Sequence, residues 1–127
     1  MRKHILLVDQ SRTIQVLLVT YFRNTGHAVI VCSTPQEALH VLAGLHPVPD
    51  SIFLAVGQSK EAYKVINHVK EHEAYSSTRL IAMVAEEEKA ALERTLYGVI
   101  YLVKPFHIQD ALALVSTPEG ASSRTHM

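Results

Sequence analysis

Five short runs of apolar residues divide the chain, and none of them alternates with polar residues as a half-exposed strand would. They cover residues 5–8, 28–31, 51–55, 80–84 and 99–103, and only Ser51, at the start of the third run, is polar. Uninterrupted apolar runs of this length are typical of strands that are covered on both faces of a sheet. The pattern therefore predicts five buried strands.

The segments that follow these runs have the periodicity of amphipathic helices. Ser11 is a suitable N-cap for the first helix, and Gly26 follows its end. Thr34 and Glu37 have the spacing of a capping box at the start of the second. The expected helices cover about residues 12–25, 35–43, 61–71, 86–97 and 108–115. The apolar stripe of the first helix consists of Ile14, Leu17, Leu18, Tyr21 and Phe22.

This order, a strand followed by a helix five times, predicts an α/β fold with a parallel sheet and helices on both faces. Because crossovers between parallel strands are right-handed, few topologies remain. We expect a doubly wound five-stranded parallel sheet of flavodoxin-like order 2-1-3-4-5. Residues 1–115 should form one domain, and residues 116–127, rich in Ser, Thr, Gly and Pro, a flexible tail or linker.

The amino-acid composition excludes several kinds of binding partner. The 12 basic residues balance the 12 acidic ones without clustering, so we expect no direct contact of this domain with nucleic acid. No apolar run approaches the roughly 20 residues that span a bilayer, and the start is too short for a signal-peptide core. The single Cys32 cannot form an internal disulfide, which fits a reducing compartment. We expect a cytoplasmic protein without a membrane partner.

Functional residues of open parallel sheets gather at the carboxyl ends of the strands. Those positions here carry Asp9 and Gln10, Ala55, Val84 and Lys104. The chain lacks a glycine-rich phosphate-binding loop, and no serine or threonine has a readable histidine and acid beside it. No catalytic group can therefore be identified from the residues themselves, and we expect that the protein is not an enzyme.

With Pro105 and Phe106 after Lys104, these positions resemble the receiver domain of bacterial response regulators, the CheY-like family, over nearly the whole fold. In that family, two acidic residues after the first strand hold Mg²⁺ and an aspartate at the end of the third accepts a phosphoryl group. Asp9 and Lys104 match the family pattern.

Three positions depart from that pattern. Gln10 replaces the second metal-binding acid, Ala55 replaces the phosphoacceptor aspartate, and Val84 replaces a Ser or Thr. Mg²⁺ prefers several hard oxygen ligands, and alanine has no nucleophile. The resemblance thus implies a degenerate member, a pseudo-receiver: a two-component phosphorelay module whose Mg²⁺ site is lost, with no cofactor and no metal.

Such a module would act through protein–protein interaction, independently of phosphorylation. The resemblance implies a protein partner, a covalently linked output domain or a second copy of the chain in a homodimer. The family's usual partner face and switch aromatic correspond to Leu92, Leu96, Tyr97, Tyr101 and Ile108. Some of these side chains must belong to the core, so only a partly exposed subset would be accessible.

Two structural expectations accompany this interpretation. Asp9 and Lys104 should form an ion pair that closes the crevice, because opposite charges about 4 Å apart attract even after solvent screening. Lys104–Pro105 is a candidate cis peptide bond, since receivers characteristically have one there.

Alternatives remain open. A receiver could be phosphorylated at a non-standard residue such as Asp9, or at Asp50 at the opposite end of the sheet. A flavodoxin-like small-ligand binder is a further alternative, although the strand-end loops offer little aromatic surface for a flavin. His68 and His72 share a helix face as zinc ligands do, but no third ligand follows, and a solvated polar stripe explains them equally well.

Overall fold

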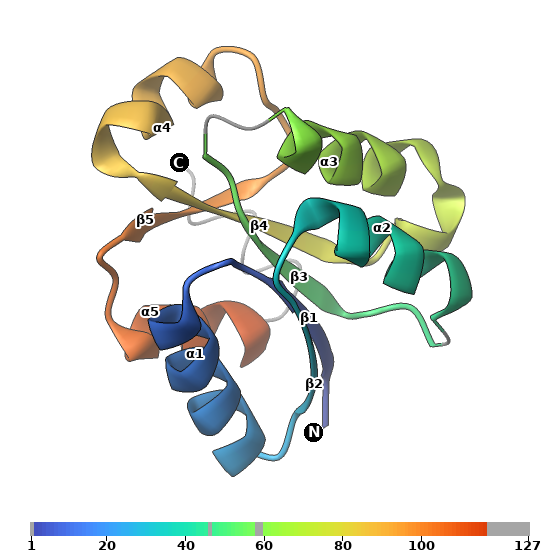
Figure 1. The fold of residues 1–127 in the computed structure, drawn as a ribbon, viewed down its shortest axis with the longest axis vertical. Helices are drawn as coiled ribbons and strands as arrows, with labels where there is room; N and C mark the ends of the chain where they lie inside the picture. Colours follow the sequence, from blue (N-terminus) through green and yellow to red (C-terminus); the bar gives the residue numbers. More distant parts are fainter. Residues whose placement is uncertain (1, 46, 58–59, 117–127) are drawn as a thin grey trace.

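The structure, a computed structural model, describes residues 2–45, 47–57 and 60–116, and it confirms the predicted α/β fold (Figure 1). Five parallel strands form one sheet in the order β2-β1-β3-β4-β5. The strands are β1 (His4–Val8), β2 (Ala28–Cys32), β3 (Ser51–Ala55), β4 (Arg79–Ala85) and β5 (Ile100–Lys104). The helices are α1 (Arg12–Asn24), α2 (Pro35–Gly44), α3 (Glu61–Glu71), the 3-10 turn η1 (Glu73–Tyr75), α4 (Glu86–Glu93) and α5 (Ile108–Ser116).

The sheet separates two apolar clusters. Helices α1 and α5 cover one face, and α2, α3 and α4 lie on the other (Figure 1). The first cluster includes Phe22 and Phe53, whose ring centroids lie 5.1 Å apart. The second contains Leu54, Ile66 and Val84. Because successive residues of a strand point to opposite faces, the continuous apolar runs supply both clusters at once.

Helix starts follow the predicted caps. Ser11 Oγ accepts the Ile14 N–H at 3.3 Å at the start of α1. At the start of α2, Thr34 Oγ1 accepts the Glu37 N–H at 3.2 Å, and Glu37 Oε1 accepts the Ser33 N–H at 2.8 Å. These bonds satisfy backbone donors that have no partner within the helix.

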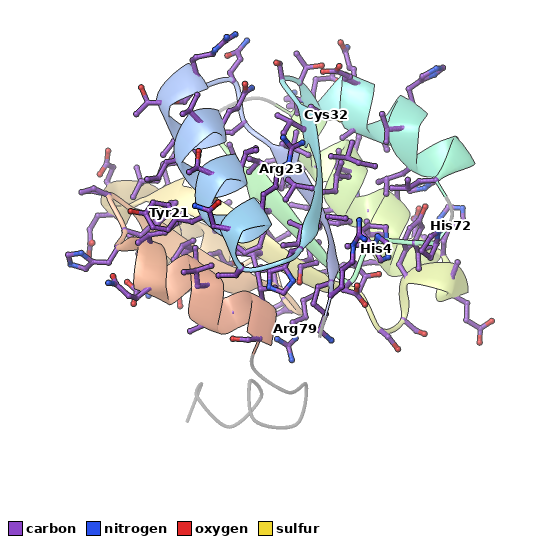
Figure 2. All side chains as sticks on the ribbon, turned by 90° about the horizontal axis from the view of Figure 1, so that it is seen from below. His4, Tyr21, Arg23, Cys32, His72 and Arg79 are labelled. Atoms are coloured by element: carbon purple, nitrogen blue, oxygen red, sulfur yellow. The ribbon has the colours of Figure 1, made fainter. Side chains whose placement is uncertain are left out.

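Three sequence predictions about helices are wrong in detail. Tyr21 is 42% exposed on α1 (Figure 2), because Leu18 and Phe22 fill the side that faces the sheet. Helix α4 ends at Glu93, about one turn before Gly98, whose φ of 77° belongs to the turn into β5. Helix α5 includes Ser116, whose hydroxyl donates to the Leu112 carbonyl at 3.1 Å. The rest of the predicted tail, residues 117–127, lies outside the described residues.

No helix in the described part of the chain combines the length and the apolar character that crossing a membrane requires.

Candidate functional site at the carboxyl edge of the sheet

Asp9 lies directly after β1, at the carboxyl edge of the sheet. Its backbone N–H donates to the Cys32 carbonyl at 3.1 Å, which continues the pairing of β1 with β2. The side chain is only 4% exposed. Its Oδ1 accepts the Ser11 N–H at 2.8 Å, and its Oδ2 accepts a hydrogen bond from Lys104 Nζ at 2.8 Å. The predicted ion pair is therefore present.

Lys104 is the last residue of β5 and lies in register with Ala85 of β4. The Lys104–Pro105 peptide bond is cis, as expected. The lysine side chain is 31% exposed, so water reaches the ammonium group but hardly reaches the carboxylate of Asp9. The pair thus neutralises a nearly buried negative charge, which would be costly to leave alone.

Gln15 adds a polar link that the sequence did not predict. From the first turns of α1, its Nε2 donates to the Asp9 carbonyl at 2.6 Å and to Ser33 Oγ at 3.2 Å. It therefore ties the loop after β1 to the loop after β2. A glutamine six residues after the acid carries no sequence signal for this role, because only the fold brings the two loops together.

A cavity of about 420 Å³ opens beside Asp9. Ala55, the last residue of β3, forms part of its wall with Gln10, which is exposed. The structure thus brings three of the predicted site residues together around one space. Among the described residues, the lining consists of Val8, Asp9, Gln10, Ser33, Thr34, Pro35, Gln36, Ala55, Glu61 and Ala62.

Val84 and Lys104 do not line this cavity. Val84 is 1% exposed and packs into the cluster beneath α2, α3 and α4. Lys104 bonds to Asp9 Oδ2 and is not among the lining residues. At the carboxyl edge, Asp9 therefore takes part in both a cavity wall and an ion pair.

The predicted partner face separates into buried and exposed parts. Leu92 and Leu96 belong to the core, whereas Tyr101 and Ile108 are partly buried. Tyr101 donates its hydroxyl to the Leu96 carbonyl at 2.9 Å, and burial raises the pKa of this phenol, as does the nearby Glu93. Tyr97 is 70% exposed and is the most accessible member of the set.

The side chains of His68 and His72 contact each other at the C-terminal end of α3. Their ring centroids lie 4.2 Å apart, and His72 Nδ1 donates to the His68 carbonyl at 2.7 Å. His68 Nε2 donates to the Tyr75 hydroxyl at 3.3 Å, which in turn donates to the Leu42 carbonyl at 3.4 Å. Among the described residues, no three potential ligands gather around a metal-sized site. His68 instead connects α3 to the end of α2 through Tyr75 of η1.

Comparison with known proteins supports the fold independently. No protein-family model matches the sequence. The chain is similar to the regulatory protein AtoC of Escherichia coli, with 25% identity over 112 residues. The match covers 87% of this chain but 24% of AtoC, so the chain spans about a quarter of that protein's length.

Solved structures agree more closely in shape than in sequence. The chemotaxis response regulator CheY4 of Vibrio cholerae superposes with a TM-score of 0.76 at 21% identity, over 91% of this chain and 99% of that one. The receiver domain of the histidine kinase PA1611 from Pseudomonas aeruginosa gives 0.74 at 19% identity, over 91% and 95%. The fold is that of a receiver domain. In this receiver fold, the edge that carries Asp9, Ala55 and Lys104 is the candidate site.

Proposed function

We propose that this chain is a receiver-like signal-transduction module of two-component type that acts by binding another protein and accepts no phosphoryl group at position 55. The observation that carries the proposal is Ala55 at the end of β3, in the wall of the cavity beside Asp9. An alanine methyl group has no nucleophilic atom, and phosphoryl transfer needs one in line with the phosphorus.

The donor set beside Ala55 does not fit Mg²⁺, an ion that demands near-ideal octahedral oxygen coordination. Asp9 already binds the Lys104 ammonium and the Ser11 N–H. The neighbouring Gln10 offers only a neutral amide. The PA1611 receiver domain, by contrast, was solved with a magnesium ion coordinated in its active-site cleft. The donor set of this chain supports a module without metal-assisted chemistry.

The alternative acceptors are unfavourable. A phosphoryl transfer to Asp9 would break its contact with Lys104 and would need room around a side chain that is 4% exposed. Asp50 lies at the opposite edge, where its Oδ2 accepts the His4 N–H at 2.7 Å. Asp9 is held by its ion pair and Asp50 lies away from the candidate site, so neither carboxylate is favourably placed as an attacking nucleophile.

The binding partner is proposed to be a protein or a linked output domain that contacts the face around Tyr97, together with the partly buried Tyr101 and Ile108. Tyr97 is mostly exposed, and aromatic side chains are enriched at protein interfaces. In the homodimeric form of this proposal, the partner is a second copy of the chain.

Intact-mass spectrometry after incubation with acetyl phosphate and Mg²⁺ tests the proposal. The native chain should gain no phosphoryl mass. An Ala55→Asp variant, which restores a carboxylate at the end of β3, provides the matched comparison. A stoichiometric adduct on the native chain would overturn the proposal, and mapping the adduct would identify the acceptor.

A further inference from the structure

Helix α1 carries a basic face with an exposed valine between its arginines. Arg12, Val16, Thr20 and Arg23 follow one another at helical spacing, so they lie along one side of α1. All four are exposed, and Val16 is 58% exposed although it is apolar. Arg23 Nη2 lies 3.5 Å from the Val29 carbonyl, at the outer limit of a hydrogen bond, so its charge remains available. The helix contains no acidic residue.

Helix α4 carries a face of the opposite charge. Glu86, Ala90 and Glu93 lie along one exposed side, again at helical spacing, with the alanine between the two glutamates. The helix has four glutamates and one lysine, Lys89, and Arg94 follows its end. The ion pairs among the described residues involve neither α1 nor α4, so these charges are not neutralised within the chain.

The two faces cannot meet within one molecule, because α1 and α4 cover opposite faces of the sheet (Figure 1). Between two molecules, α1 against α1 would bring arginines together, and α4 against α4 would bring glutamates together. Only α1 against α4 pairs opposite charges, and such complementarity selects a partner and its orientation. We propose that copies of this chain associate head to tail, with Val16 of one copy against Ala90 of the next. The inference rests on the proposed function in that a second copy is the protein partner.

The spacing of the charges fits this contact. Arg12 and Arg23 are about 16 Å apart along the axis of α1, and Glu86 and Glu93 are about 10 Å apart along α4. Long arginine side chains span a difference of about 3 Å at each end, and the small Ala90 leaves room for the valine. One helix face is smaller than a standard interface, so we expect a dissociation constant on the order of 0.1 mM that rises with salt.

A head-to-tail contact has a consequence that a symmetric dimer lacks. Each bound copy keeps one unused face, α1 at one end of the assembly and α4 at the other, so a third copy can add by the same contact. The assembly therefore grows with protein concentration beyond two copies.

Sedimentation equilibrium of the full chain at low ionic strength, up to about 1 mM or ten times the expected dissociation constant, measures this growth. The average mass should rise above that of the monomer, pass that of a dimer and fall again when salt is added. A mass that stays at the monomer value, levels off at the dimer value or is raised by salt would overturn the inference.

Two variants each block one face. Val16→Glu places an acid opposite the acidic face of α4, and Ala90→Arg places a base opposite the basic face of α1. Each alone should weaken association by about 10-fold or more. Asn67→Asp, which adds a negative charge at an exposed position of α3, is the control and should change association by less than about 2-fold.

An equimolar mixture of the two variants should associate again, because one supplies an unaltered α4 face and the other an unaltered α1 face. A symmetric contact would be insensitive to one of the two variants, and that result would overturn the inference. Its failure is distinguishable from that of the proposed function. A phosphoryl adduct on the native chain would overturn the proposed function alone, whereas a chain that stays monomeric would overturn this inference and leave a different protein as the partner.

Discussion

The two edges of the sheet each contain an aspartate, and their surroundings differ. Asp9, at the carboxyl edge, bonds to the ammonium group of Lys104 and lines a cavity. Asp50, at the amino edge, accepts the His4 N–H through its side chain at 2.7 Å. Its backbone N–H donates to the His4 carbonyl at 2.7 Å, and its carbonyl accepts the Arg79 N–H at 2.9 Å.

Several such bonds stabilise the amino edge, whose residues His4 and Arg79 are labelled in Figure 2. Thr78 Oγ1 donates to the Pro49 carbonyl at 2.7 Å, and Arg79 Nη1 donates to the Leu114 carbonyl of α5 at 2.6 Å. These side chains join strand starts to the neighbouring segments. The comparison shows that one residue type stabilises the fold at one edge and lines a site at the other, according to its position.

The largest expected effect comes from unpairing Asp9. Lys104→Met removes the only cation within ion-pair distance of Asp9 among the described residues and leaves a nearly buried carboxylate without a counter-charge. Because Lys104 is partly exposed, we expect a loss of about 2–3 kcal/mol in the free energy of unfolding, below the full cost of breaking a buried pair. Urea denaturation at pH 7 measures it.

Lys64→Met is the matched control, because it breaks the exposed pair with Glu61 and should cost less than about 0.5 kcal/mol. A double mutant that also carries Asp9→Asn should recover part of the loss, since the uncompensated charge is gone. If Lys104→Met lowers the free energy of unfolding by no more than Lys64→Met does, the pair of Asp9 with Lys104 contributes nothing measurable to stability.

A smaller effect is expected at the amino edge. Asp50→Ala removes the acceptor of the His4 N–H and should lower the free energy of unfolding by about 1–2 kcal/mol. Asp50→Asn keeps an oxygen in the same place and should cost about half as much or less. Thermal or urea unfolding of both variants checks the expectation. Equal losses would indicate that the charge of Asp50, and not its hydrogen bond, stabilises this edge.

The sequence predicted the fold well because its signals are local and mutually consistent. Apolar runs located all five strands to within about one residue, and the caps at Ser11 and Thr34 located two helix starts. It failed for Tyr21 and for the end of α4, where the outcome depends on which neighbours cover a helix face. Periodicity identifies an apolar stripe but not its width.

The candidate site was predictable in part. The position after β1 identified Asp9, and the resemblance to receivers matched it with Lys104 across the sheet. The contribution of Glu61 to the cavity, and the Gln15 bonds to Asp9 and Ser33, were not predicted. These contacts join elements that are separated in sequence and carry no motif, so only the three-dimensional arrangement reveals them.

The smallest predicted effect is a pH dependence of the free energy of unfolding that arises at the amino edge. His27 lies at the amino edge, and its Nδ1 accepts the Lys3 N–H at 3.1 Å. Burial lowers the pKa of His27 from its usual 6.5, the positive Lys3 acts in the same direction, and Asp50 opposes them. The folded state therefore favours the neutral ring, and the unfolded chain binds more protons. Stability from this group is fully present above about pH 6.5 and is lost as the pH falls through the folded-state pKa.

We expect the free energy of unfolding to fall between pH 7.5 and 5.5 through His27, as its Nδ1 becomes protonated and can no longer accept the Lys3 N–H. His27→Gln should remove this part of the slope. Burial, and then the neighbouring His72, also lower the pKa of His68. The part of the pH dependence that comes from His68 should therefore remain in the His27→Gln variant. His107→Gln, at an exposed position, is the control. An unchanged slope in His27→Gln would mean that the hydrogen bond at the amino edge does not depend on the charge of the imidazole.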